Sequence, residues 1–146
     1  MFRGSAAAKI DDKGRLKMPK EFLRLLSDNY GSEVFITSVN GESALVYPLD
    51  VWEEIERKLA QVPSANKAKQ RYLARVNYFG QQLKLDQQGR GVVPPILRGK
   101  AEIVGEVVVS GRLDHLEVWN RERFEQQLLE EPFEAEDFDS LAEFGL

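Results

Sequence analysis

The chain has 146 residues, of which 42% are hydrophobic and 30% charged, a size and composition typical of a globular domain. It has no cysteine and no stretch close to the roughly 18 consecutive apolar residues of a membrane span, which excludes disulfides, thiol catalysis and cysteine-based zinc sites and argues against a membrane protein. The net charge of −4 gives no general attraction for nucleic acid. Since no apolar export segment follows Met1, we expect a cytoplasmic protein.

The net charge conceals two basic regions and an acidic tail. Residues 1–25 carry seven Lys or Arg against three acidic side chains, and residues 57–100 carry ten against one. Residues 125–146 carry eight carboxylates and no basic side chain. Because DNA responds to the local field of a protein surface, the two basic regions remain compatible with DNA binding.

The first predicted elements are β-strands with one short helix between them. Residues 16–18 alternate apolar and basic side chains, as in a half-buried strand, and Pro19 suits the first position of a helix. Residues 34–39 predict a strand by their β-branched and aromatic content. Asn40-Gly41 then predicts a tight hairpin turn to a partner strand over residues 43–47.

Two helices are predicted in the middle of the chain. Asp50 followed by Glu53 is an N-terminal capping pattern, and the apolar spacing that follows predicts an amphipathic helix over residues 50–61. Ser64 is a suitable cap for a second helix that ends near Phe79. That helix carries basic side chains at four-residue spacing, which indicates either a solvated face or a surface that pairs with acids of a neighbouring subunit or with DNA. These basic residues are Lys67, Arg71 and Arg75.

The chain also repeats itself. Residues 10–19 and 85–94 share the order apolar-Asp-x-x-Gly-Arg, followed four residues later by a proline, at an offset of 75. Two further matches keep the same order at slightly shorter offsets of 73 and 72, and they join residues 33–38 to 106–111 and Val46-Tyr47 to Val118-Trp119. Three matches in one order indicate an internal duplication.

The duplication organises the whole chain. We expect two homologous β-units at residues 5–51 and 80–123, a helical connector at residues 52–79, and a C-terminal helix and acidic tail at residues 124–146. Neither unit has enough strands to close a core alone, so we expect the two to interlock. The expected fold class is mainly β with α.

The repeated Asp-x-x-Gly-Arg segments are the candidate functional turns. Gly14 supplies the positive φ that a tight turn needs, and Asp11 can accept backbone N–H groups across it. Arg15 then projects from a rigid loop, where its guanidinium can bond phosphate or guanine. The alternative is an ordinary turn with an internal Asp–Arg pair. The second copy has Asp86, Gly89 and Arg90 in the same places.

The sequence resembles the MraZ family, whose halves are AbrB-like (SpoVT–AbrB-type) units. The resemblance covers nearly the whole chain. It is carried by the start Met1-Phe2-Arg3-Gly4, the two turn segments, Leu45-Val46-Tyr47-Pro48 leading to Trp52, and Leu116-Glu117-Val118-Trp119. Departures include Gly91 in place of an apolar residue, and Gln87 and Gln88 in place of Asp12 and Lys13, so the second turn has less charge.

The resemblance implies a double-split, swapped-hairpin β-barrel and a sequence-specific DNA-binding transcriptional regulator. It also implies a ring-like homo-oligomer that binds short direct repeats upstream of the division and cell-wall gene cluster as a repressor, and hence a nucleoid-associated protein. By the same likeness Arg15 contacts DNA and Arg90 holds the equivalent place. We expect the DNA contacts to come from Arg15, Lys13, Lys17, Arg90, Arg3 and Lys9.

Other function classes fit less well. His115 is the only histidine and lacks a recognisable catalytic neighbourhood, so we expect no enzyme, no metal, no cofactor and no small-molecule substrate. An antitoxin-like protein-interaction module and an RNA-binding protein remain as alternatives. In the acidic tail, Phe138 and Leu141 favour a short docked helix. Our hypothesis is that the tail covers a basic surface and tempers non-specific DNA binding.

Overall fold

The computed structural model describes residues 1–146 and contains one open six-stranded sheet, a separate two-stranded ladder and six helices. The strands are β1 (Ser5–Lys9), β2 (Arg15–Lys17), β3 (Glu33–Thr37), β4 (Ala44–Pro48), β5 (Gln81–Lys84), β6 (Arg90–Val92), β7 (Glu106–Gly111) and β8 (Leu116–Asn120). The helices are α1 (Lys20–Asn29), α2 (Leu49–Ala60), α3 (Lys67–Phe79), α4 (Pro95–Lys100), α5 (Arg121–Glu130) and α6 (Ala135–Ala142).

The strand order interleaves the two halves of the chain. The six-stranded sheet runs β1-β7-β8-β4-β3-β5, and every pairing in it is antiparallel. β1 adds to the β7–β8 hairpin of the second half, with Ser5 opposite Ser110, while β5 adds to the β3–β4 hairpin of the first half, with Glu33 opposite Lys84. β2 and β6, one from each half, form the separate ladder. Each half therefore completes the sheet of the other.

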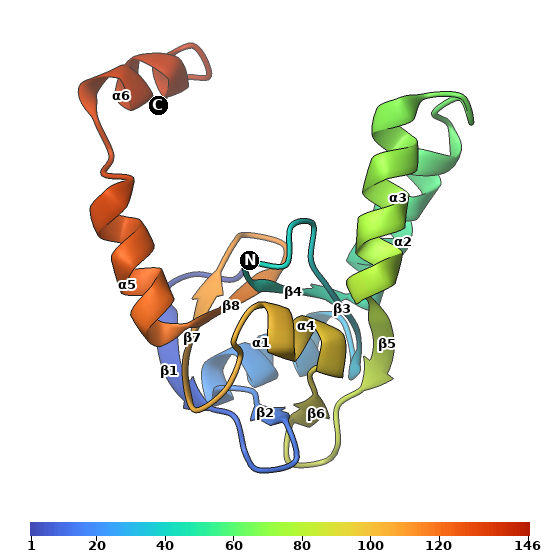
Figure 1. Ribbon diagram of the computed structural model, residues 1–146, viewed down its shortest axis with the longest axis vertical. Helices are drawn as coiled ribbons and strands as arrows, with labels where there is room; N and C mark the ends of the chain where they lie inside the picture. The colour runs from blue at the N-terminus through green and yellow to red at the C-terminus, as the bar shows by residue number, and fades with distance from the viewer.

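A single main core lies between the sheet and the helices α1 and α4 (Figure 1). Phe22 and Leu26 of α1 and Leu97 of α4 are almost fully buried in it. Phe2 is 1% exposed and stacks on Tyr30 with ring centroids 5.9 Å apart. Burial of each large apolar side chain contributes about 1.5–3 kcal/mol, so this core stabilises the interleaved arrangement of both halves.

The fold class differs from the expectation in two ways. The helices hold more residues than the strands, so the protein is mixed α and β rather than mainly β. The six-stranded sheet does not close, and the specific swapped-hairpin barrel is not confirmed. Only the isolated bridge between Ile10 and Leu16 links the first half's β1 region to β2, and β2 and β6 have three residues each. Such short strands pair with each other and leave the sheet edges β1 and β5 open.

Three predicted helix starts shift by a few residues. Pro19 directly precedes α1 instead of being its first residue, α2 begins at Leu49 directly after Pro48, and neither start has a side-chain cap. The predicted cap Asp50 therefore lies in the first turn of α2, where a negative charge favours the helix dipole. α3 is capped by Asn66 rather than Ser64, since its Oδ1 accepts the Lys69 N–H at 3.0 Å.

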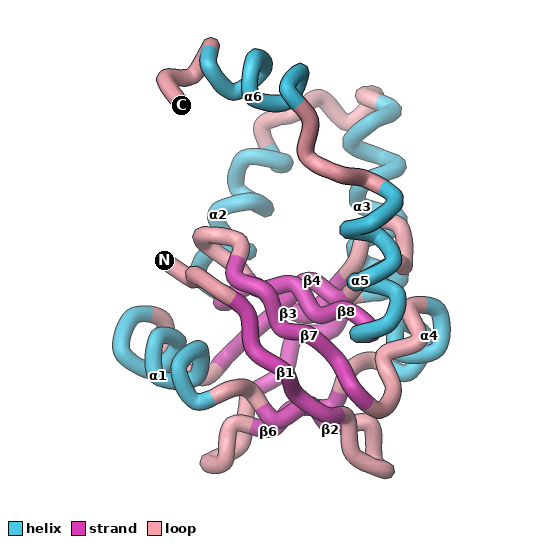
Figure 2. Tube along the Cα trace, turned by 90° about the vertical axis from the view of Figure 1, so that its left-hand side faces the viewer, coloured by secondary structure: helices cyan, strands magenta, loops and turns pink.

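Two helical projections extend from the sheet. We call α2 and α3 (residues 49–79) the hairpin arm and α5 and α6 (residues 121–146) the tail arm. Figures 1 and 2 show both arms at one end of the molecule and the turns beside β2 and β6 at the other. The acidic tail does form a helix, but it lies far from the turns of its own chain, so it does not cover them. None of the helices combines the length and apolar character that crossing a bilayer requires.

Candidate nucleic-acid interface

The two Asp-x-x-Gly-Arg segments form turns of the same geometry. The Asp11 Oδ1 accepts the backbone N–H groups of Lys13 and Arg15, both at 2.9 Å, and the Gly14 N–H donates to the Asp11 carbonyl at 2.9 Å. In the second turn the Asp86 Oδ1 accepts the N–H groups of Gln88 and Arg90, also at 2.9 Å. Asp11 and Asp86 thus each accept two backbone N–H groups across their own turn.

Each turn depends on its glycine. Gly14 has φ of +77° and Gly89 has φ of +75°, a backbone region that other L-residues enter only at a cost. Each glycine also packs against a helix of the other half of the chain. A Cβ on Gly14 would lie 1.5 Å from the Arg98 Nη1, and a Cβ on Gly89 would lie 2.5 Å from the Leu23 Cδ2. The duplication relates Leu23 to Arg98, so the two turns have equivalent supports of different chemistry.

The arginines are fixed at one edge and open at the other. The Arg15 Nε donates to the Asp11 Oδ2 at 2.7 Å, and the Arg90 Nε donates to the Asp86 Oδ2 at 3.1 Å. The internal ion pair weighed above as the plain alternative thus exists in both turns. The terminal nitrogens of both guanidiniums have no hydrogen-bond partner in the chain, and their side chains are about a third exposed. Each arginine can still donate to an external acceptor.

The electrostatics of the turns favour the charged aspartates. The backbone N–H of Arg15 is the main cause that lowers the pKa of Asp11 below its ordinary value, with a further contribution from the Arg15 side chain. The backbone N–H of Arg90 likewise lowers the pKa of Asp86. Both carboxylates are therefore ionised at neutral pH. The ion pairs that orient the two arginines do not change with small shifts of pH around neutrality.

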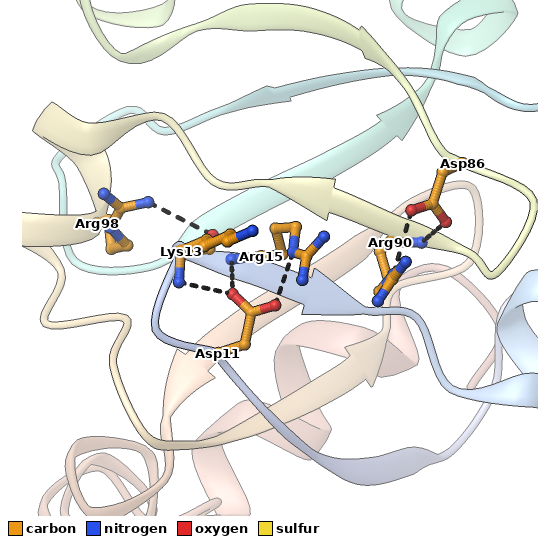
Figure 3. Close-up of polar contacts among 7 residues, drawn as sticks. Asp11, Lys13, Arg15, Asp86, Arg90 and Arg98 are labelled. Atoms are coloured by element: carbon orange, nitrogen blue, oxygen red, sulfur yellow. Dashed lines mark hydrogen bonds and ion pairs between the residues drawn. The ribbon is translucent and has the colours of Figure 1, made fainter.

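The β2–β6 ladder joins the two turns into one unit. The Met18 N–H donates to the Gly89 carbonyl at 2.8 Å, and the Val93 N–H donates to the Gly14 carbonyl at 3.0 Å. Leu16 and Gly91 point into the core, so the residues on either side of them share the outer surface of the ladder. That surface carries Arg15, Lys17, Arg90 and Val92. Figure 3 shows Arg15 and Arg90 on the two strands. We call it, together with the turns 11–14 and 86–89, the turn face.

The structure places the six predicted contact residues in different positions. Lys13 is exposed on the first turn, and Lys17 lies directly opposite Arg90 in the ladder. Lys9 ends β1, opposite Glu106 and two residues before the first turn. Arg3 precedes β1 at its other end, next to the Phe2–Leu113 bridge, so it is remote from the turn face. Arg15, Lys13, Lys17 and Arg90 are therefore the predicted residues that the fold brings together.

Arg98 supports the first turn, a role that was not predicted from the sequence. Arg98 Nη1 donates to the Val93 carbonyl at 3.1 Å and to the Gly14 carbonyl at 3.4 Å. Its guanidinium occupies the space beneath the first turn (Figure 3). The offset of 75 residues that relates it to Leu23 is the signal that could have revealed this role.

The other titratable and aromatic side chains do not form a second candidate site beside the turn face. His115 hydrogen-bonds the neighbouring Asp114 at 2.8 Å and stacks on Tyr47 at 4.4 Å, in the β7–β8 turn at the far end of the sheet. Tyr47 is largely buried, and that burial is the main cause that raises its pKa to about 12. These contacts are those of a packed aromatic cluster around Trp52. The structure contains no cluster of three or more side chains able to hold a metal ion.

Comparison of the sequence with known proteins identifies its family. The family model described as "MraZ protein, putative antitoxin-like" matches residues 1–75 and 80–143. The chain is 51% identical to the Transcriptional regulator MraZ of Acidobacterium capsulatum, over 100% of both chains, and 45% identical to that of Koribacter versatilis, again over 100% of both. It is 34% identical to the one of Syntrophobacter fumaroxidans, over 87% of this chain and 84% of the relative. The chain therefore belongs to the MraZ family.

Proposed function

We propose that this protein is a transcriptional regulator that binds promoter DNA through the turn face. The relatives named Transcriptional regulator MraZ support the regulatory role. The observation that carries the DNA contact is the cross-strand pair of Lys17 and Arg90. Like charges directly opposite each other in a ladder destabilise it. A surface that retains them beside Arg15, with Lys13 on the adjoining turn, is suited to an anionic partner.

The turns orient their arginines before DNA arrives. Because Asp11 and Asp86 already hold the Nε edge of each guanidinium, little side-chain freedom is lost when the terminal nitrogens bind. Those nitrogens can donate to the O6 and N7 of a guanine in the major groove or to a phosphate. Lys13 and Lys17 supply phosphate contacts, and Lys9 extends the basic surface along β1. Arg3 is not included in the proposed surface.

A single turn face covers few base pairs, so we include assembly in the proposal. A homo-oligomer, in the ring form that the family resemblance implies, presents several turn faces to several direct repeats and raises affinity by effective concentration. Binding to repeats upstream of the division and cell-wall gene cluster then represses transcription by occupying the promoter. In this proposal the protein is cytoplasmic and nucleoid-associated.

The test is binding to the protein's own upstream promoter DNA, measured by fluorescence anisotropy at several salt concentrations. We expect Arg15→Ala to weaken binding at least about 10-fold, because one bidentate contact contributes roughly 1–3 kcal/mol. The matched control is Arg57→Ala, since Arg57 pairs with Glu54 on the hairpin arm, away from the turn face. Equal affinity of the wild-type protein and Arg15→Ala would contradict the proposal.

A further inference from the structure

Val92 is the one large apolar side chain that a strand of this protein exposes. It is 44% exposed at the end of β6, whereas the other exposed hydrophobic residues lie in helices, in loops or at the chain ends. The other outward side chains of the β2–β6 ladder are Arg15, Lys17 and Arg90. A single exposed valine is common on protein surfaces, but this one lies on a ladder that is otherwise cationic.

The internal duplication shows that Val92 stands where the first copy has a cation. The offset of 75 residues relates Arg15 to Arg90 and Lys17 to Val92. In the ladder, Arg90 lies opposite Lys17, whereas Arg15 lies opposite Val92. The turn face therefore has two similar halves, and only one of them has an apolar side chain beside its arginine.

The half with Arg90 and Lys17 is suited to the phosphates of DNA. Side chains directly opposite each other in an antiparallel ladder have Cβ atoms about 4.5–5.5 Å apart, so these two cations repel each other. A phosphate bound beside both of them offsets that repulsion. Phosphate contacts position a protein on the duplex and carry no base information. This half is therefore suited to positioning rather than to reading bases.

The half with Arg15 and Val92 is suited to the edges of bases. The major groove admits a two-stranded β-ribbon, and the β2–β6 ladder is a ribbon of this kind. In that groove a thymine shows its 5-methyl group, and a guanine shows the O6 and N7 acceptors. The methyl groups of Val92 match the thymine methyl, and the free terminal nitrogens of Arg15 match the guanine acceptors.

The spacing of Arg15 and Val92 fits neighbouring base pairs. Their opposite places in the ladder put the Cβ atoms about 4.5–5.5 Å apart, and successive base pairs are stacked about 3.4 Å apart. The Asp11 carboxylate holds the Arg15 Nε at 2.7 Å, and a β-branched side chain such as valine is stiff at χ1. Both side chains are therefore held in place before they meet two adjacent base pairs.

We propose that Val92 is a specificity residue that contacts the 5-methyl group of a thymine next to the guanine bound by Arg15. This inference rests on the proposed DNA binding through the turn face, and it divides that face into two roles. Arg15 and Val92 read one base step in the major groove, while Arg90 and Lys17 bind phosphates of the backbone. Removal of the thymine methyl therefore weakens binding only through Val92.

Uracil supplies the test, because it differs from thymine only in lacking the 5-methyl group. Two duplexes of the protein's own promoter, one with thymine and one with uracil throughout, are compared by fluorescence anisotropy. The full-length wild-type protein should bind the uracil duplex about 4-fold more weakly, the size expected for one buried methyl group. Val92→Ser should bind both duplexes equally. Val92→Thr has the same hydroxyl and keeps one methyl, so it should retain a preference of about 2-fold or more.

Two control variants separate this contact from general changes in the DNA. Lys17→Ala, at the place equivalent to Val92, should weaken binding to both duplexes alike and reduce the slope of log K against log salt by about 0.9. Leu113→Ala removes an exposed apolar side chain from the β7–β8 turn at the far end of the sheet, and it should keep the wild-type preference for thymine. Val92→Ser should keep the wild-type salt slope, because it changes no charge.

Single-base substitutions test whether the two contacts are neighbours. 7-Deazaguanine lacks the N7 acceptor, so the guanine bound by Arg15 is the one whose replacement weakens the wild-type protein but not Arg15→Ala. That guanine should be adjacent to the thymine at which a single uracil has its effect. A separation of several base pairs contradicts the proposed base step.

The outcomes distinguish this inference from the proposed function. Equal affinity of the wild-type protein for the two duplexes, or a preference that survives in Val92→Ser, would overturn the role of Val92. DNA binding through the turn face still stands in that case, provided that Arg15→Ala weakens binding. If the wild-type protein and Arg15→Ala bind the promoter equally, the proposed function fails and the role of Val92 fails with it.

Discussion

The turn before β2 and the turn before β6 share a backbone but differ in their surroundings. The first has Lys13 at its tip and Arg98 beneath its glycine, whereas the second has Gln88 at its tip and Leu23 beneath its glycine. Hydrogen bonds to the two aspartates agree within a few tenths of an ångström. The duplication has therefore preserved what shapes the turn and let the charge around it diverge. Hence we expect the first turn to contribute more to DNA affinity.

Substitution of the two arginines should give the largest effects and tests the difference between the two turns most directly. Arg15→Ala should weaken binding to the promoter repeats by about 10- to 100-fold, as expected for loss of a bidentate base contact. Arg90→Ala should weaken it by less, about 3- to 10-fold, since the second turn brings fewer cations to the DNA. Both affinities are measured by anisotropy at one salt concentration. An equal loss for the two variants would show that the turns contribute alike.

The glycines test whether the two turns are equally rigid. Both Gly14→Ala and Gly89→Ala place a Cβ at positive φ, which costs roughly 1–2 kcal/mol of stability. Gly89→Ala should be the worse of the two, because its Cβ meets a packed Leu23 methyl, whereas the Arg98 guanidinium can swing away from Gly14. Urea denaturation reports both values. A larger loss for Gly14→Ala would mean that Arg98 is held more firmly than its hydrogen bonds indicate.

The aspartates test the bracing and its dependence on pH. Asp11→Asn and Asp86→Asn should each lower the Tm by less than the glycine changes, and by similar amounts, because the two turns are braced alike. A lowered pKa means that this stabilisation is complete above the ordinary value of about 3.9 and is lost as the pH falls through the lowered value. The difference in Tm from the wild-type protein should thus be constant from pH 8 to 5 and shrink below pH 4.

The smallest effect comes from exchanging the charges at the turn tips. Lys13→Gln should weaken DNA binding by a fewfold and reduce the slope of log K against log salt by about 0.9, the value for one phosphate contact on duplex DNA. Gln88→Lys, at the equivalent place in the second turn, should have the opposite effects. If Gln88→Lys leaves both affinity and slope unchanged, the second turn does not approach the backbone of the DNA.

Local patterns predicted the parts of the fold that local chemistry decides. The glycine turns and the helix near residues 50–61 follow from backbone preference and apolar spacing, and the structure has them. β3 and β4 do pair as a hairpin, but residues 38–43 connect them, so the tight turn predicted at Asn40-Gly41 is wrong. The predicted first residues of the helices were less accurate. Asn66 rather than Ser64 caps α3, and α2 begins directly after Pro48, so that Asp50 lies in its first turn. The open sheet was not predictable, since closure depends on the length and pairing of β2 and β6 rather than on any local pattern.

The candidate site was predicted in part for the same reason. Asp11, Gly14 and Arg15 form a contiguous motif, so their joint geometry could be predicted from spacing. The opposition of Lys17 and Arg90 depends on the register between strands 73 residues apart, and the support from Arg98 depends on how α4 packs. Both features depend on tertiary structure. In the sequence, only the internal duplication pointed to these two contacts.

The interleaved strand order has a consequence for how the protein is made. Ser5 pairs with Ser110, so the first strand to leave the ribosome has no partner until 105 more residues have been added. At about 5–20 residues per second this delay is roughly 5–20 s, during which the edge of β1 is unpaired. β1 is short and rich in alanine, with Lys9 at its end, a composition that gives neighbouring nascent chains little apolar surface on which to aggregate.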